Sequence, residues 1–296
     1  MIITRLTLAM LVLLLMAAPG RAHAQETSPG QASDASAPAD GAAPGAQDEE
    51  DDEGISRVEP DFTVVNLPTT LRLPKFGSAF RVTHRFARPL GEGDFGSLLE
   101  DFFGFDGGAQ IGLEYRFGVW SGAQVGIYRT SDRTIQFFGQ YGLLRQREGM
   151  PVSVDAWLTV DGTNNFRDSY SPGVGAVVSH TFDERAAVYV QPVWVNNTNV
   201  LPSELAEDDS SFVIGLGGRL RVRPTVYVTA EVAPSVAGHD PGDPVVAFGL
   251  EKRVGGHSFQ VNFSNSVPTT LAQQIRRGGA NEDDWYIGFN ISRKFY

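Results

Sequence analysis

The sequence contains no cysteine among its 296 residues. This absence excludes disulfide frameworks, cysteine-ligated zinc or iron–sulfur sites and cysteine nucleophiles, and it leaves no thiol to carry a lipoprotein anchor. Basic residues are also scarce, because 24 Lys and Arg stand against 35 Asp and Glu, for a formal net charge of −11. A general nucleic-acid binder needs a basic footprint, so we expect no nucleic-acid partner.

Long hydrophobic runs are absent beyond the N-terminus. Residues 1–24 combine the basic Arg5, an apolar stretch at residues 6–18 and a small-x-small sequence at residues 22–24. This combination is typical of a cleaved signal peptide. The apolar stretch is too short to span a bilayer as a helix, which needs about 20 residues. We therefore predict an exported protein that has no transmembrane helix after the signal.

The composition changes again after the signal. Residues 25–59 are rich in Ala, Pro, Gly, Ser and acidic residues, and they include an unbroken carboxylate run at residues 48–53. Such a segment has too little apolar surface to offset its ordering entropy, so we predict a disordered acidic linker. The carboxylate run lacks the ligand spacing and the glycine turn of a calcium-binding loop. Residues 60–77 then lead into the main domain, residues 78–296.

Apolar and polar residues alternate with a period of two throughout the main domain. Ile111, Leu113 and Tyr115, for example, alternate with Gly112 and Glu114. This alternation predicts β-strands with one apolar and one polar face. We predict about twelve strands, with ten or fourteen as alternatives, at residues 79–87, 109–118, 123–130, 134–146, 151–161, 172–182, 187–196, 211–222, 226–234, 244–253, 257–265 and 285–295.

The connections favour a membrane barrel over a soluble β-sandwich. Those after even-numbered strands are short, such as residues 183–186, whereas those after odd-numbered strands are mostly long, such as residues 197–210. Outer-membrane barrels sort their loops in this way, with short periplasmic turns and long outer loops. Most strands also have about the 9–11 residues that a tilted strand needs to cross a membrane. We therefore predict an all-β fold, a closed antiparallel transmembrane β-barrel in the bacterial outer membrane, with its linker in the periplasm.

Aromatic residues gather at the predicted strand ends. Trp194 and Phe212 fall at the outer ends, and Phe182 and Phe295 fall at the inner ends. Barrels carry such aromatic girdles at both membrane interfaces. The terminal aromatic strand predicts recognition by the barrel-assembly machinery, and the apolar faces predict outer-membrane lipid as the surroundings.

Several short motifs carry a family resemblance. They are His84-Arg85-Phe86, Phe103-Gly104-Phe105-Asp106-Gly107-Gly108, Gly255-Gly256-His257-Ser258-Phe259-Gln260 and the closing Gly288-Phe289-Asn290-Ile291-Ser292-Arg293-Lys294-Phe295. Over roughly residues 70–296 the chain resembles a family of bacterial outer-membrane β-barrel proteins that is catalogued as a domain of unknown function. Ala87 stands where the family has Gly. The resemblance implies the barrel and its location, and it implies no activity.

Candidate catalytic groups are few. No two of the five histidines have the spacing of a helical zinc site, and we expect no metal, cofactor or catalytic residue. Some outer-membrane barrels are lipid hydrolases, so a serine–histidine pair is one alternative. The adjacent His257 and Ser258 would point to opposite faces of a strand. His257 with Ser264, or His84 with a serine on a neighbouring strand, would remain within reach.

The predicted inward face carries charges of both signs. Our candidate lumen-lining residues are Glu114, Arg116, Asp155, Arg219, Arg221, Glu231 and Glu251. Such charges either line a selective pore or pair across a closed lumen. The many inward glycines favour open volume, although residues 60–77 are either a plug for it or a periplasmic lead-in.

We therefore predict a passive, porin-like channel for small solutes rather than an enzyme. Arg219 and Arg221 are expected to influence its ion preference. A non-conducting outer-membrane scaffold or binding protein that acts through its long outer loops is the second hypothesis. A lipid-modifying barrel enzyme is the third.

Overall fold

The computed structural model describes residues 58–93, 96, 100, 107–201, 205–279 and 284–295. All of them belong to the compact unit Pro44–Tyr296. The predicted signal, the predicted linker up to residue 57 and the terminal Tyr296 lie outside the described residues.

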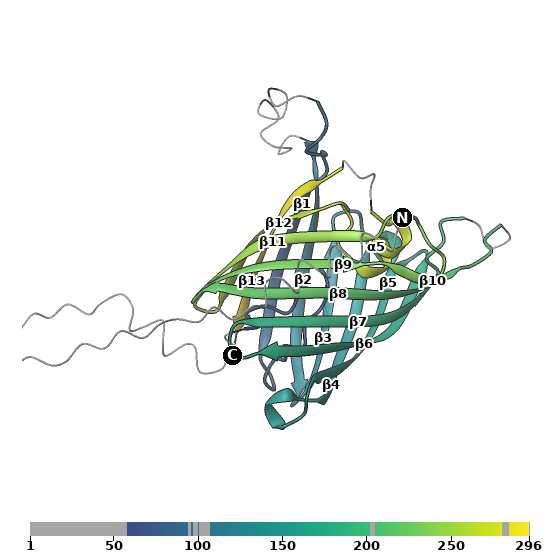
Figure 1. Cartoon of the computed structure of the whole chain (residues 1–296). Helices are drawn as coiled ribbons and strands as arrows, with labels where there is room; N and C mark the ends of the chain where they lie inside the picture. Colours follow the sequence, from purple (N-terminus) through teal and green to yellow (C-terminus); the bar gives the residue numbers. More distant parts are fainter. Residues whose placement is uncertain are drawn as a thin grey trace, which may run out of the picture. The chain divides into compact units, whose positions relative to one another are not determined.

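Twelve antiparallel strands close into a ring, as predicted (Figure 1). They are β1 Ser78–Phe86, β2 Ala109–Trp120, β3 Ala123–Thr130, β4 Ile135–Leu144, β5 Ser153–Gly162, β6 Tyr170–Phe182, β7 Ala186–Asn196, β8 Ser210–Arg223, β9 Val226–Ala233, β11 Val245–Val254, β12 His257–Ser264 and β13 Tyr286–Phe295. Successive strands of the ring pair with one another, and β1 pairs with β13 to close it. No strand bound differs from its predicted position by more than two residues.

A few short elements were not predicted. Strand β10 (Ser235–Gly238) pairs with β8 just beyond the end of β9. Pro234 separates β9 from β10, and a proline has no N–H to give to the ladder. The other additions are the helices α4 (Thr163–Phe166) and α5 (Leu271–Arg277) and the 3₁₀ turn η2 (Gln146–Glu148). Within the described ranges, none of the helices has the length and apolar character needed to cross a membrane.

The two faces of the strands have opposite character. On β2, Leu113 and Tyr115 are 48% and 47% exposed, whereas Glu114 and Arg116 are 6% and 1% exposed. The same inversion recurs around the ring, with leucines such as Leu250 facing outward. An apolar outer surface over a polar interior is the pattern of a barrel in a lipid bilayer.

The two ends of the barrel differ in their connections. At the short-turn end, brief turns join β2 to β3, β6 to β7, β8 to β9 and β11 to β12. At the long-loop end lie the connections that contain α4, β10 and α5. Trp194 and Phe212 are register partners on the outer face near the long-loop end, and Phe182 is exposed at the short-turn end. Aromatic side chains therefore mark both rims, as the sequence predicted.

Candidate functional site

Polar side chains line the lumen and are buried there. The principal ones are Arg81, Arg85, Glu114, Arg116, Gln124, Gln140, Asp155, Gln191, Arg219, Glu231, Glu251, Gln260, Asn262 and Asn290. Six of the seven predicted lumen-lining charges belong to this set. The seventh, Arg221, lies at the short-turn end, where its guanidinium donates to the carbonyl oxygen of Pro224 and stands 3.7 Å from the carboxylate of Glu184.

Glu114 forms the centre of the first charge cluster. Its carboxylate accepts hydrogen bonds from Arg81 at 2.9 Å and from Arg116 at 3.0 Å. Arg116 also donates to Gln140 and lies over the ring of Phe138, 4.6 Å from its centroid. All these groups belong to strands β1, β2 and β4, so the cluster is a property of the barrel wall.

Arg219 and Glu251 form the second charge cluster. Their side chains, on β8 and β11, are fully buried and meet at 2.8 Å. The hydroxyl of Ser258 donates to the same carboxylate at 2.7 Å. Removing one partner of such a buried pair would leave an uncompensated charge, which costs about 3–5 kcal/mol. This pair, too, is made between strands of the wall.

Residues 58–73, which we call the lumenal segment, occupy the space inside this wall. The segment is a hairpin: Thr63 and Pro68 form an antiparallel bridge, and the amide of Val64 donates to the carbonyl of Leu67 at 2.8 Å. In its turn, the side chain of Asn66 accepts a hydrogen bond from Arg85 of β1. Both limbs run toward the short-turn end, where residue 60 contacts Lys294 of β13 and Arg72 contacts the carbonyl oxygen of Leu144, the last residue of β4. Val64, Val65 and Leu67 of the turn are almost completely buried.

One carboxylate of the wall holds the turn of the hairpin. The backbone amides of Val65, Asn66 and Leu67 all donate to Glu231 of β9, at 2.9–3.0 Å. The Asn66 side-chain amide donates to its second oxygen at 2.7 Å. Successive backbone N–H groups that converge in this way form an anion-binding concavity, and here the anion is part of the barrel.

Wall side chains on other strands bind the two limbs. Gln260 and Asn290 donate to the carbonyl oxygens of residues 64 and 65 at 2.6 and 3.0 Å. Arg72 forms an ion pair with Asp155 of β5, to which Gln140 also donates at 2.6 Å. Lys294 of β13 donates to the carbonyl oxygen of residue 60. The segment is thus tied to strands around the ring.

Inward glycines make room for the lumenal segment. A Cβ atom at Gly215 would approach the methyl groups of Leu67 to 2.9 Å, and one at Gly217 would approach Val64 to 3.1 Å. At Gly118 a Cβ would lie 2.1 Å from the carbonyl oxygen of Pro74. The sequence suggested that inward glycines leave open volume, but at these positions the volume is filled by the chain itself.

Helix α5 fills the lumen from the long-loop end. Its residues Ala272 and Ile275 pack in an apolar cluster with the inward Val193, Val195 and Val213. Its side chains also reach polar groups of neighbouring loops. Two separate parts of the chain therefore occupy the two halves of the lumen.

Asp132, in the connection from β3 to β4, holds one end of α5. It accepts hydrogen bonds from the hydroxyl of Thr130, the side chain of Gln273 and the amide of Thr134. Burial alone would raise the pKa of Asp132, but these hydrogen bonds outweigh it and hold that pKa below its usual value. The carboxylate is therefore charged at neutral pH.

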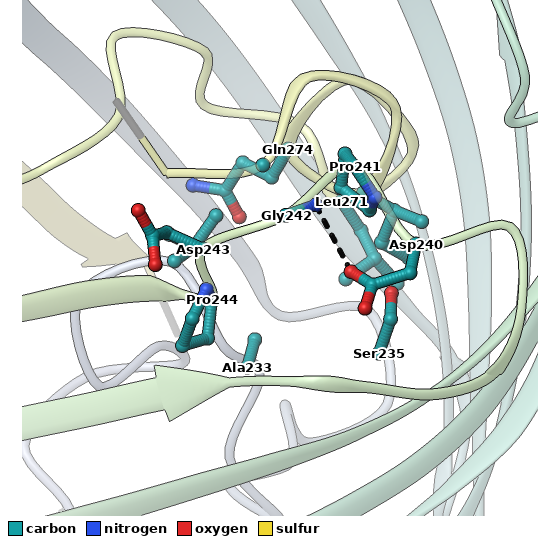
Figure 2. Close-up of a pocket in the computed structure, with 12 residues that line it drawn as sticks. Ala233, Ser235, Asp240, Pro241, Gly242, Asp243, Pro244, Leu271 and Gln274 are labelled. Carbon is teal, nitrogen blue, oxygen red and sulfur yellow. Dashed lines mark hydrogen bonds between the residues drawn. The ribbon is translucent and has the colours of Figure 1, made fainter. Parts of the chain in front are cut away.

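Little free space remains between these fillings. A cavity of about 30 Å³ lies between the lumenal segment and α5, among Arg81, Trp157 and Gln191. It corresponds to about one water molecule. A smaller pocket, of about 10 Å³, lies beside α5. Figure 2 shows this pocket, with the hydrogen bond that the amide of Gly242 donates to the carboxylate of Asp240. Within the described ranges, no three His, Asp or Glu side chains converge as a metal site would require.

The serine–histidine alternatives can be located on the barrel. Ser258 is buried in the lumen against Glu251, whereas His257 stacks with the outward Phe259. They lie on opposite faces, as the alternation predicted. His84 is outward and stacks on Phe289 at 4.8 Å. In the described part of the chain, no hydrogen bond joins a histidine ring to a serine hydroxyl.

Some residues of the site were missing from the sequence prediction. Arg81 and Arg85 follow the same alternation that located Glu114, so the pattern of β1 could have identified them. Arg72 and Asn66 carry no comparable signal, because they lie outside the strands. Their partners on the barrel wall are far away in the sequence.

The closed ring, the apolar outer surface and the polar lumen define a membrane β-barrel of the outer-membrane type. The family comparison is more specific. The chain belongs to the family described as "Membrane bound beta barrel domain (DUF5777)", whose model matches residues 61–295. This match confirms the resemblance seen in the sequence. No curated protein sequence is significantly similar to the chain.

Solved structures of outer-membrane proteins align with the chain at low sequence identity. The NanC porin aligns with a TM-score of 0.49 and 9% identity, covering 74% of this chain and 99% of that one. The KdgM porin aligns with a TM-score of 0.48 and 7% identity over 74% and 99% of the two chains. The outer membrane protein Omp33 of Acinetobacter baumannii gives 0.44 and 14% identity over 75% and 99%. These are similarities of fold at low sequence identity.

Proposed function

We propose that this protein is a porin-like outer-membrane channel for small solutes, closed in the described conformation by its own lumenal segment and by helix α5. The observation that carries the proposal is the organisation of the wall charges. Arg81, Glu114 and Arg116 pair with one another, and Arg219 pairs with Glu251. Arg81 and Arg219 also donate to Thr63 of the segment, but each would keep its wall carboxylate when the segment leaves, so these ion pairs would remain as a polar lining.

The attachment of the segment suits reversible release. Most of its contacts with the wall are hydrogen bonds, which water replaces at a net cost of about 0.5–1.5 kcal/mol each between neutral groups and about 1.5–3 kcal/mol each to a charged group. Both limbs of the hairpin run toward the short-turn end. The hairpin can therefore withdraw through one mouth without threading the chain past a strand.

The orientation follows from the architecture of outer-membrane barrels, which have short periplasmic turns. The short-turn end then faces the periplasm, together with the linker that precedes residue 58. Lipid surrounds the apolar outer face, and β13, which ends at Phe295, is the strand presented to the barrel-assembly machinery. Small solutes would pass from the long-loop end once the lumen is open.

Withdrawal of the segment would change which charges are free. Asp155 would lose Arg72, and Glu231 would lose the backbone amides of the turn, whereas Glu114 and Glu251 would keep their arginines. Free carboxylates in a pore favour cations. We therefore assign the strongest influence on ion preference to Asp155 and Glu231. The prediction that Arg219 and Arg221 influence ion preference is tested separately, by reversing the charge at both positions and measuring the reversal potential.

The experiment compares two forms of mature residues 25–296 in a planar bilayer. One has the natural sequence, and the other has residues 58–73 and helix α5 (Leu271–Arg277) replaced by Gly/Ser linkers of equal length. We expect rare openings from the first and stable conductance steps, cation-selective in a salt gradient, from the second. Silence from a replaced form that still shows heat-modifiable barrel mobility on gels would contradict the channel.

A non-conducting scaffold is the second candidate. The observation that favours it is the filling of the lumen from both ends, by the lumenal segment and by α5. In that case replacing both fillings would still give no conductance, and the long loops would carry the function.

A further inference from the structure

Three arginines gather on the outer side of the long-loop rim. Arg129 is the last outward residue of β3, Arg133 lies in the connection to β4, and Arg167 follows α4. All three are exposed. We call them the rim arginines. None of them forms an ion pair within the ranges that the structure describes.

Asn165 links two of the rim arginines. Its side-chain oxygen accepts a hydrogen bond from Arg129 at 3.1 Å, and its backbone amide donates to the carbonyl oxygen of Arg133 at 2.7 Å. Arg167 is two residues further along the chain. Its amide donates to the carbonyl oxygen of Thr163 at 3.0 Å. The loop backbone thus brings the three positive residues to one place on the rim.

The loop reaches this arrangement through an unusual backbone. Asn164, Asn165 and Phe166 all have positive φ, at 50°, 60° and 63°. Asparagine tolerates this region, but a bulky residue adopts it only where its surroundings compensate. The compensation is visible in the next contacts of Phe166.

Phe166 folds back onto the lipid-facing surface. Its ring packs edge-on against Phe137 of β4, at 5.2 Å, and against Tyr170 of β6, at 5.0 Å. Phe137 and Tyr170 are outward and exposed. Directly beneath the rim arginines, therefore, lies an aromatic floor on the part of the barrel that faces the bilayer.

The two carboxylates that are sequence neighbours of Arg133 and Arg167 already accept hydrogen bonds. Asp168 accepts the side-chain amide of Asn164 at 2.9 Å. Asp132 turns toward the lumen, where it binds Gln273. Among the described residues, no carboxylate forms an ion pair with the three guanidinium groups.

We propose that the rim arginines bind the phosphate-bearing headgroup of an anionic lipid in the leaflet at the long-loop end. Arginine recognises phosphate through charge-assisted, often bidentate hydrogen bonds. The aromatic floor of Phe137, Phe166 and Tyr170 receives the upper part of the acyl chains.

The test measures lipid retention by native mass spectrometry in a neutral detergent. Phosphatidylglycerol is titrated against phosphatidylcholine on the mature protein and on the triple variant Arg129→Gln, Arg133→Gln, Arg167→Gln. A cation near a membrane surface contributes about five-fold in affinity, so the triple variant is expected to lose on the order of 100-fold for phosphatidylglycerol. Raising the salt concentration should weaken the wild-type binding in the same direction.

A matched control uses three exposed arginines of the short-turn end, in the variant Arg147→Gln, Arg185→Gln, Arg223→Gln. This variant removes the same charge and should keep its phosphatidylglycerol. Equal losses in both triple variants, or equal retention of the two lipids by the wild type, would overturn the proposal. If the rim triple variant fails to fold, the single Arg129→Gln variant serves, with an expected loss of roughly five-fold.

Discussion

Replacing Glu231 with glutamine is expected to loosen the lumenal segment. Glutamine keeps one oxygen for the backbone amides of the turn, but it places a nitrogen against the side-chain amide of Asn66. The remaining hydrogen bonds also lose the charge of the acceptor, and charge-assisted bonds are about twice as strong as neutral ones. Part of this loss is offset, because a neutral amide is easier to bury than a carboxylate. The net weakening is about 2 kcal/mol, or roughly 30-fold in the undocked population.

The absence of cysteine makes this change measurable. A single cysteine introduced at Val64, which is 0% exposed, reports undocking through its rate of reaction with a soluble maleimide. Rapid opening makes that rate proportional to the undocked population. We expect labelling roughly 30-fold faster with Glu231→Gln. The exposed Glu148 at the short-turn end provides the control variant Glu148→Gln, which should leave the rate unchanged. Rates within about three-fold of the parent for Glu231→Gln would show that the Glu231 carboxylate does not hold the turn in place.

Three further substitutions test different parts of the filled lumen. Gly118→Ala would place a Cβ 2.1 Å from a backbone oxygen of the turn after the lumenal segment. The resulting overpacking of about 1–3 kcal/mol should speed the maleimide labelling of the Val64 cysteine. Gly139→Ala, whose Cβ would meet nothing within 4 Å, should leave the labelling rate unchanged. Trp157→Ala should lower barrel stability by about 3–5 kcal/mol, seen as an earlier heat-modifiable gel shift, and outward Leu158→Ala should change it little. Because the pKa of Asp132 is lowered in the folded protein, its contribution to holding α5 is present above the unfolded pKa and is lost as pH falls through the folded pKa. Cleavage of α5 by pepsin should therefore increase as the pH falls through the folded pKa. The Asp132→Asn variant should abolish that pH dependence.

The strands and their faces could be predicted because their signal is local. A residue on a strand points to the face opposite that of its neighbours. The polarity of Leu113 and Glu114 alone therefore predicts that the first faces the lipid and the second faces the lumen. The same rule placed Arg219 and Glu251 inward. It needs no knowledge of which strands pair.

The short elements could not be predicted from the sequence because their signals are too weak or not local. Helix α5 has a capping-type threonine before it, Thr270, and Gly278 after it, but its seven residues are too few for a helical period to emerge. Strand β10 is defined by its pairing with β8 rather than by its own pattern. Neither feature is visible in a local reading of a long loop.

The filling of the lumen could not be predicted from local patterns at all. The amide of Val65 and the carboxylate of Glu231 are 166 residues apart in the sequence. Inward glycines such as Gly215 indicate space, but only the tertiary structure shows whether water or chain occupies it. The plug and the periplasmic lead-in were therefore equally consistent with residues 60–77.

A disulfide between the lumenal segment and the wall tests whether the segment closes the lumen. A Cβ at Gly217 would lie 3.1 Å from the Cγ2 atom of Val64, close to the span of about 3 Å between Cβ and the far sulfur of a disulfide. The measurement is the bilayer conductance of the Val64→Cys, Gly217→Cys variant before and after reduction, with Gly217→Cys alone as the control. Our account predicts silence from the oxidised protein, openings after reduction, and no effect of reductant on the control. Equal conductance of the cross-linked and reduced forms would show that solutes do not pass where the segment lies, and would contradict the account.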